Sequence, residues 1–198
     1  MRVSGILLAA GAGSRFGGRK LLQPLHDGTP IGVAALRNLL SALDRVILVI
    51  RSGDVELAKR FAQEDARILE CARATEGMGH SLAAGIEAEA DADGWVIALG
   101  DMPHTRPATI RAVADQLAAG ARIVVPCYRN ERGHPVAFAS RCKEELLALT
   151  GDAGARAVLQ RHASEVVRID VDDPGVLQDI DTSEDLARLS GADSRRPI

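Results

Sequence analysis

The stretch LAAGAGSRFGGRK, at residues 8–20, decides the fold, and it begins where a short apolar run ends. The run at residues 3–9 has the length and aliphatic composition of a buried strand. Four glycines within residues 8–20 allow backbone N–H groups to approach a polyphosphate without interference from Cβ atoms. Arg15 and Lys20 add positive charge beside such a ligand. The stretch therefore predicts a strand that leads directly into a phosphate-binding loop.

The loop departs from two common phosphate-binding patterns. The dinucleotide-binding pattern requires glycine at the place of Phe16 and a carboxylate near Arg51, at the end of the second predicted strand. The Walker A pattern requires lysine directly after Gly18, whereas the chain has Arg19 there. These departures disfavour an NAD-dependent oxidoreductase and a P-loop enzyme. The loop alone leaves one alternative open, a flexible turn with surface cations.

The rest of the chain alternates short apolar runs with stretches of helical periodicity. The first half predicts strands at residues 3–9, 45–50, 94–99 and 122–126, and helices at residues 30–43, 55–64, 80–90 and 107–119. Ser81 is expected to cap the third of these helices. Strand–helix–strand alternation favours parallel pairing with right-handed crossovers. We therefore predict an α/β fold with a three-layer, open, mostly parallel sheet and helices on both faces.

Beyond residue 126 the predicted elements are shorter. They comprise strands at residues 135–139 and 166–171, and helices at residues 141–149, 154–161 and 182–189. The change of pattern divides one predicted domain, residues 1–190, into halves of about 1–105 and about 106–190. Residues 191–198 are expected to form a flexible tail.

Composition excludes several functional classes. The net charge of −3 comes from interspersed charges, so the chain offers no basic surface for nucleic acid or for a membrane. The first apolar run is too short for a signal peptide or a membrane span, which predicts a cytoplasmic protein. Its three cysteines have neither disulfide-framework nor zinc-site spacing. Apolar residues make up 46% and aromatic residues only 3%, so the predicted core is aliphatic.

Carboxylates follow the predicted strands at places suited to a metal ion. Asp101 comes directly after the run at residues 94–99, at the sheet edge where α/β proteins bind ligands. Asp179 and Asp181 are two residues apart and would share one face of an extended segment. Asp101 and Asp181 are therefore the predicted ligands of one Mg²⁺ ion. Taken singly, Asp101 is equally suited to a turn, and Asp181 to capping the last helix.

The pattern LAAGxGxRxG, followed by Lys20, resembles the signature of the MobA-like NTP transferases, and most of all the molybdenum cofactor cytidylyltransferases. Five further segments resemble the family in the same order, at residues 77–85, 99–103, 132–136, 151–156 and 179–186. The resemblance spans residues 3 to about 189. It implies a nucleotide-binding fold of the glycosyltransferase-A kind, with a nucleotide half followed by an acceptor half.

The resemblance also implies roles for individual residues. The implied catalytic residues are Arg15, Lys20 and Asp101, and the implied metal ligands are Asp101 and Asp181. The implied nucleotide-binding residues are Leu8, Ala9, Ala10, Gly11, Ala12, Gly13, Lys20, Gly77, Gly79 and Ser81. The implied acceptor-binding residues are Arg132, His134, Gly154 and Arg156.

The activity implied by the resemblance is Mg²⁺-dependent transfer of CMP from CTP to the phosphate of molybdopterin, with release of pyrophosphate. The acceptor phosphate would itself be the nucleophile, so the protein need not supply a general base. The resemblance also favours CTP, because this chain has LAAG at residues 8–11, whereas LAGG is typical of the guanylyltransferase relatives. The residue that differs is Ala10. GMP transfer, another phosphorylated acceptor, and a non-catalytic cofactor-binding chaperone stay open as alternatives. A molybdoenzyme or an insertion chaperone is a candidate protein partner.

Overall fold

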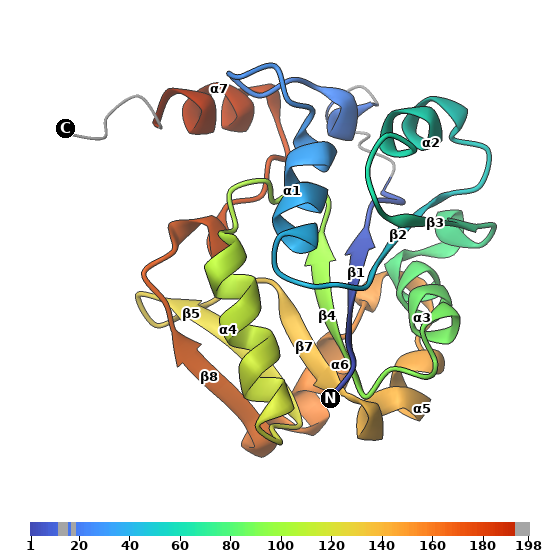
Figure 1. Cartoon of the computed structure of the whole chain (residues 1–198), viewed down its shortest axis with the longest axis vertical. Coiled ribbons are helices and arrows are strands. Elements are labelled where there is room, and N and C mark those ends of the chain that lie inside the picture. Colours follow the sequence, from blue (N-terminus) through green and yellow to red (C-terminus); the bar gives the residue numbers. More distant parts are fainter. Residues whose placement is uncertain (12–15, 17–18, 193–198) are drawn as a thin grey trace.

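The computed structural model describes residues 1–11, 16 and 19–192 (Figure 1). The predictions for Ala12, Gly13 and Arg15, and for the tail at residues 193–198, lie outside these described residues. The fold is an α/β sheet with helices on both faces, which confirms the predicted fold class. No helix in the described part of the chain has both the length and the apolar character to cross a membrane.

The sheet has eight strands in the order β3-β2-β1-β4-β7-β5-β6, with β8 paired to β5. The strands are β1 (Val3–Leu8), β2 (Val46–Arg51), β3 (Arg67–Cys71), β4 (Gly94–Leu99), β5 (Ile123–Tyr128), β6 (Glu131–Arg132), β7 (Val136–Ala139) and β8 (Val166–Asp170). Strands β1 to β4 pair in parallel, as does β8 with β5. Only β6 and β7 pair antiparallel to their neighbours in the described sheet, and β7 lies between β4 and β5. The prediction of a mostly parallel sheet is therefore confirmed.

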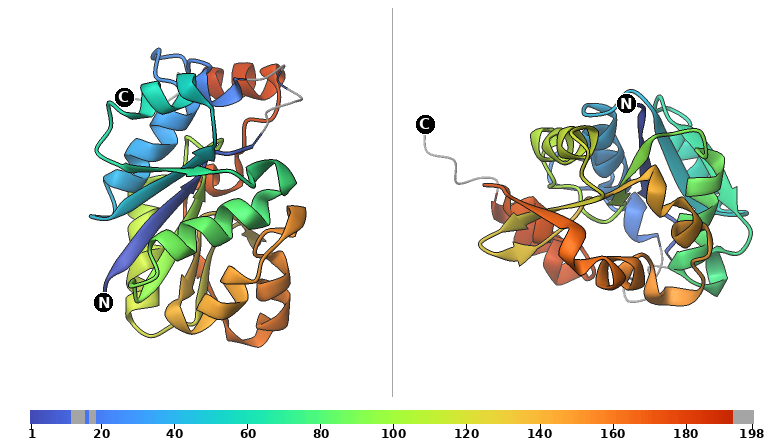
Figure 2. Two further views of the ribbon diagram at one scale, coloured as in Figure 1. Left: turned by 90° about the vertical axis from the view of Figure 1, so that its right-hand side faces the viewer. Right: turned by 90° about the horizontal axis from the view of Figure 1, so that it is seen from below.

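Two apolar layers form the core, one on each face of the sheet. Successive residues of β1 alternate between them, with Ile6 in one layer and Leu7 in the other, as the pleat of a strand requires. The first layer packs against α3 (Met78–Ala88), α5 (Lys143–Leu147) and α6 (Arg156–Arg161). The second packs against α1 (Ile31–Leu40), α2 (Val55–Phe61) and α4 (Pro107–Ala118). Figure 2 shows the sheet between these layers.

The end of the chain returns to the beginning of the fold. Helix α7 (Ser183–Ala192) lies beside the start of α1 (Figure 1). Buried Ile180 and Leu189 pack there against Ile31. Helix α7 also extends to Ala192, so two residues of the predicted tail are helical. This return brings the C-terminal segment next to the loop that follows β1.

The start of α3 differs from the prediction. The helix begins at Met78 with Gly77 as its N-cap, and Ser81 lies inside the first turn, so the prediction that Ser81 caps the helix is wrong. Gly77 has a φ of 127°, a backbone conformation that favours glycine, and a Cβ there would collide with the backbone of Gly151. The close approach of residues 77 and 151 therefore sets the start of this helix.

Candidate active site

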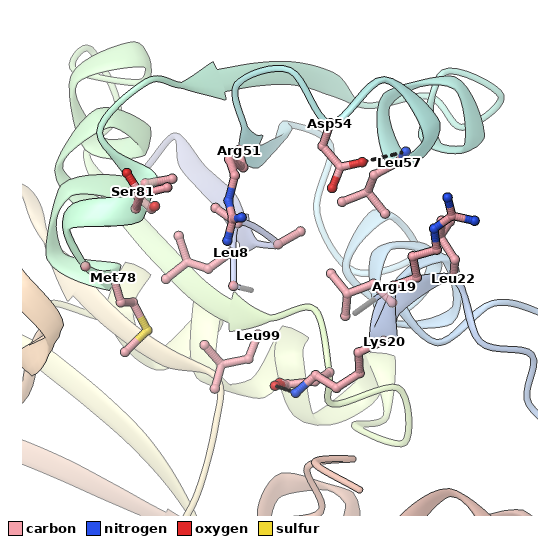
Figure 3. A pocket seen from close by; sticks show the side chains of 18 of the residues that line it. Leu8, Arg19, Lys20, Leu22, Arg51, Asp54, Leu57, Met78, Ser81 and Leu99 are labelled. Carbon is pink, nitrogen blue, oxygen red and sulfur yellow. Dashed lines mark hydrogen bonds and ion pairs between the residues drawn. The ribbon is translucent and has the colours of Figure 1, made fainter. Parts of the chain in front are cut away.

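A cavity of about 510 Å³ opens at the carboxyl ends of β1, β2 and β4 (Figure 3). Strand β1 pairs with β2 on one side and with β4 on the other, so the chain changes direction across the sheet at this place. Open α/β sheets bind their ligands in the crevice at such a switch point. The predicted nucleotide-binding residues that line the cavity are Leu8, Ala9, Ala10, Gly11, Lys20, Gly77 and Ser81. Asp101 also lines it, whereas Gly79 does not.

Lys20 joins two of the predicted site carboxylates at one end of the cavity. Its Nζ donates hydrogen bonds to Oδ2 of Asp101 at 2.7 Å and to Oδ1 of Asp181 at 2.9 Å. Burial lowers the pKa of Lys20, but the hydrogen bonds and negative charges of Asp101 and Asp181 outweigh this effect and raise the pKa. Lys20 is therefore an ammonium ion that holds together carboxylates from distant parts of the chain.

The backbone of the last loop places Asp181 beside Asp101. The N–H of Ile180 donates to the carbonyl of Asp101 at 3.0 Å, and the Ile180 side chain is fully buried. Asp179 lies in the same group, because burial, followed by the charges of Asp181 and Asp101, raises the pKa of Asp179. In the described part of this group, three carboxylates thus lie around the ammonium of Lys20.

A divalent cation fits this end of the cavity. Asp101 Oδ1 is buried and has no hydrogen-bond partner within the described residues, so it retains a lone pair for a ligand. Within the described residues there is no group of three or more His, Cys, Asp or Glu side chains that could hold a metal. Mg²⁺ commonly takes only one or two carboxylates and completes its octahedron with water and substrate phosphates. Asp101 and Asp181 supply a donor set of that kind.

The start of α3 forms another wall of the cavity. The backbone N–H of His80 donates to the carbonyl of Gly77 at 3.2 Å. No side chain in the described structure caps this helix, which leaves the N–H groups of Met78 and Gly79 for an anion. Gly79 allows the turn to pack closely, because a Cβ there would lie 2.8 Å from the carbonyl oxygen of Thr150. Ser81 is buried and adds a hydroxyl to the cavity lining. The wall thus combines hydrogen-bond donors with the positive end of a helix dipole.

The four residues predicted to bind the acceptor do not line this cavity. Arg132 is exposed on β6, and Arg156 begins α6 after Gly154, which has a φ of 50°. His134 is half-buried beside a second, very small cavity, and its buried Nδ1 has no hydrogen-bond partner in the described chain. Burial and the charge of Arg132 lower the pKa of His134, while the charge of Asp101 opposes them. His134 therefore lies near the carboxylate group but outside the main cavity.

Sequence reasoning missed several residues that line the cavity. Figure 3 shows Arg51, Asp54 and Met78 around its rim, and Asp152 also contributes to the lining. Arg51 had a detectable signal, since it ends the strand beside β1 and must therefore lie at the same carboxyl edge of the sheet. Asp152 reaches the cavity only because its loop packs on the start of α3, and no local pattern predicts that contact.

Asp185 holds the loop that carries Asp181. Its Oδ2 accepts hydrogen bonds from the backbone N–H of Asp181 at 3.3 Å and of Thr182 at 3.0 Å. Hydrogen bonds from Arg188 and from Thr182 lower the pKa of Asp185 to about 2. Its stabilising contribution is therefore present above its ordinary pKa of 3.8 and is lost as the pH falls towards about 2.

We expect the Thr182 amide resonance to report this titration in NMR spectra of the protein. The resonance should stay nearly constant as the pH falls to 3.8, the ordinary pKa of an aspartate, because Asp185 remains ionised there. An Asp185→Asn variant should expose the same amide to faster hydrogen exchange at neutral pH, because an amide oxygen is a weaker acceptor than a carboxylate. An inflection near pH 3.8, or unchanged exchange in the variant, would contradict this role of Asp185.

Comparison with known proteins agrees with the geometry of the site. The model of the MobA-like NTP transferase domain matches residues 5–166. Purine catabolism protein PucB of Bacillus subtilis is 34% identical over 194 residues, covering 91% of this chain and 92% of that protein. Nicotine blue oxidoreductase of Paenarthrobacter nicotinovorans is 32% identical over 196 residues, covering 94% and 96%. Molybdenum cofactor cytidylyltransferase of Escherichia coli is 25% identical over 181 residues, covering 91% of each.

Solved structures share the fold over nearly the whole chain. Rv0371c of Mycobacterium tuberculosis, in complex with manganese, is 29% identical with a TM-score of 0.76, covering 97% of this chain and 100% of that chain. A nucleotidyl transferase of Methanothermobacter has a TM-score of 0.83 at 24% identity, covering 98% of each chain, which shows the fold alone. A divalent metal thus occurs in a structure of a relative. The chain belongs to the MobA-like NTP transferase family and is a nucleotidyltransferase.

Proposed function

We propose that the protein transfers CMP from CTP to the phosphate of a molybdopterin-type cofactor, with Mg²⁺ as the metal and pyrophosphate as the second product. The observation that carries the proposal is the group formed by Lys20, Asp101 and Asp181 at the end of a nucleotide-sized cavity. The Escherichia coli relative named molybdenum cofactor cytidylyltransferase supports the choice of substrates.

In the proposed reaction, an oxygen of the acceptor phosphate attacks the α-phosphorus of CTP, and the bond from that phosphorus to the bridging oxygen of pyrophosphate breaks. Asp101 and Asp181 would hold the Mg²⁺ ion, which when bound neutralises charge on the phosphates. Lys20 lies between these carboxylates and adds a fixed positive charge where negative charge develops on the leaving group. The acceptor phosphate is already ionised near neutral pH, so positioning and electrostatics supply the rate.

We propose that the acceptor binds to residues in the second half of the chain. We propose that Arg132, His134, Gly154 and Arg156 bind it, and that residues 1–190 work as one domain. The cytoplasm is the proposed location, where the buried thiols of the three free cysteines stay reduced. The dinucleotide product would then pass to a molybdoenzyme, directly or through an insertion chaperone.

The test is incubation of the purified protein with CTP, Mg²⁺ and molybdopterin. We expect stoichiometric release of pyrophosphate and formation of a cytosine dinucleotide of the cofactor, both of which mass spectrometry detects. A parallel reaction with a simple sugar phosphate separates the general chemistry from the acceptor. Transfer of CMP only to the sugar phosphate, which would give a cytidine diphosphate sugar, would overturn the proposed acceptor and leave the transfer chemistry standing.

Ala10 provides a test of the base preference. Its methyl group lies at the cavity wall, where glycine in its place would leave more room for a purine. We expect the wild type to have a kcat/KM for CTP at least about tenfold above that for GTP, in line with what one methyl group discriminates. Ala10→Gly should narrow this ratio mainly by improving GTP. Parallel kinetics with both nucleotides measure it, and a wild-type preference for GTP would overturn the assignment of CTP.

A further inference from the structure

Arg51 is a cation inside the cavity that has no role in the proposed chemistry. It is the last residue of β2, and its side chain extends into the cavity towards Leu8 (Figure 3). Its Nε is buried without a hydrogen-bond partner, and within the described residues no carboxylate forms an ion pair with it. Arginine is a donor-only side chain, and burying its N–H groups without acceptors is unfavourable. The cavity thus contains an arginine whose Nε lacks an acceptor in the described structure.

The nearby carboxylates already serve other groups. Asp54, which lines the same side of the cavity in Figure 3, accepts a hydrogen bond from the backbone N–H of Leu57 at 3.1 Å and caps α2. Glu70 accepts from the Ser52 hydroxyl at 3.0 Å and from the N–H of Gly53 at 3.1 Å. These bonds engage the two carboxylates with backbone N–H groups and with the Ser52 hydroxyl. The guanidinium of Arg51 therefore remains directed towards the ligand space.

The surroundings of Arg51 suit a flat, largely apolar ligand group. Leu8, Leu57 and Ala74 line the cavity together with Arg51, and apolar side chains of this kind pack against the face of a nucleobase. Lys20, in contrast, lies at the opposite side of the cavity from Arg51 in Figure 3, and it is hydrogen-bonded to Asp101. A nucleotide with its phosphates at Lys20 would thus extend its base towards Arg51.

We propose that Arg51 reads the nucleobase by donating two parallel hydrogen bonds to two adjacent acceptor atoms on one base edge. The proposal rests on the proposed function only in taking the cavity ligand to be a nucleoside triphosphate. The planar guanidinium presents its donors as a fork, which matches paired acceptors better than single ones. Arg51 is therefore a specificity-determining residue.

The fork distinguishes the four bases by their edges. Cytosine offers O2 next to N3, and guanine offers O6 next to N7, each a pair of adjacent acceptors. Adenine has an amino group beside N7, and uracil has an N–H between its two carbonyl oxygens, so neither edge accepts two parallel donors. Arg51 thus selects cytosine or guanine nucleotides over adenine and uracil nucleotides. Between cytosine and guanine nucleotides, the space beside Ala10 decides, because its methyl group leaves less room for a purine.

Binding measurements without any acceptor test this inference. Calorimetry with CTP, UTP and inorganic tripolyphosphate, each with Mg²⁺, would be compared for the wild type and for Arg51→Met, which keeps the apolar stem and removes the donors. We expect Arg51→Met to weaken CTP by about 10- to 100-fold, the effect of losing one or two hydrogen bonds to an ionised donor. UTP should change by less than about threefold and tripolyphosphate by less than about twofold, so the preference for CTP over UTP disappears.

Two further variants serve as controls in these binding measurements. Arg51→Lys keeps the charge but not the fork, and it should lose the preference for CTP over UTP almost as fully as Arg51→Met. Arg60→Met removes a partly exposed arginine of α2 that lies outside the cavity, and it should change none of the affinities. Circular dichroism and thermal unfolding establish that each variant is folded.

The outcomes separate this inference from the proposed function. Equal weakening of CTP and tripolyphosphate in Arg51→Met would make Arg51 a phosphate contact and overturn base reading. An unchanged CTP affinity, or a wild type that binds UTP as well as CTP, would also overturn it. The acceptor takes no part in these measurements, so failure of molybdopterin as a substrate would overturn only the proposed function.

Discussion

An Asp101→Asn variant is expected to lose at least about a hundredfold in kcat with Mg²⁺ and CTP, while keeping its fold. The change preserves shape but removes the negative charge and half of the donor capacity from the carboxylate whose Oδ1 has no hydrogen-bond partner in the described structure. Loss of a metal ligand forfeits several kcal/mol of transition-state stabilisation, and about 1.4 kcal/mol corresponds to a tenfold change in rate. Pyrophosphate release in the steady state measures kcat, and the paramagnetic resonance of Mn²⁺ measures metal affinity.

The matched control is Asp115→Asn, which removes a carboxylate from the exposed face of α4 and should leave kcat unchanged. Asp181→Asn should have a smaller effect than Asp101→Asn, because its side chain is 38% exposed compared with 24% for Asp101, so water more readily replaces it. Near-normal turnover of Asp101→Asn with Mg²⁺ would exclude Asp101 as a metal ligand.

A Lys20→Met variant is expected to change turnover and metal binding in opposite directions. Without the ammonium, kcat/KM for CTP should fall by about a hundredfold or more, since a buried charge beside the reacting phosphates is lost. The affinity for Mn²⁺ in the absence of nucleotide should rise, because Lys20 occupies oxygens of both Asp101 and Asp181 in the nucleotide-free protein. Enzyme kinetics and Mn²⁺ titration measure the two effects on the same protein sample.

Lys20→Arg is the matched comparison, since it retains the charge but replaces a compact ammonium with a planar fork. It should keep Mn²⁺ affinity close to that of the wild type and recover only part of the turnover. Weaker Mn²⁺ binding by Lys20→Met would show that Lys20 supports the carboxylate geometry instead of competing with the cation. Unchanged turnover would place the reacting phosphates elsewhere.

The sequence predicted the part of the site that depends on strand ends. The glycine loop after β1 and Asp101 after β4 follow buried apolar runs, and parallel strands bring their carboxyl ends to one edge. The ion pair between Asp181 and Lys20 is harder to predict from the sequence. It depends on Ile180, whose burial against α1 is a tertiary contact between the two ends of the chain.

The wrong prediction at Ser81 and the missed strand β3 also have physical causes in the tertiary structure. Ser81 matches an N-cap pattern, yet the contact with Gly151 makes Gly77, four residues earlier, the N-cap of the helix. Strand β3 was missed because it forms an edge of the sheet, where exposed Arg67 and Glu70 interrupt the apolar run. Local patterns thus failed wherever a distant segment, or a solvent-exposed edge, determined the structure.

The group of Lys20, Asp101 and Asp181 has a consequence for the order in which the protein is made. The lysine precedes one carboxylate by 81 residues and the other by 161, and the last of the three is supplied by the loop anchored at Ile180. A ribosome synthesises the cavity walls on β1, β2 and β4 well before it reaches that loop. A nascent or prematurely terminated chain that ends before residue 181 therefore lacks the second carboxylate, and we expect competence for transfer only after the ribosome has added Asp181.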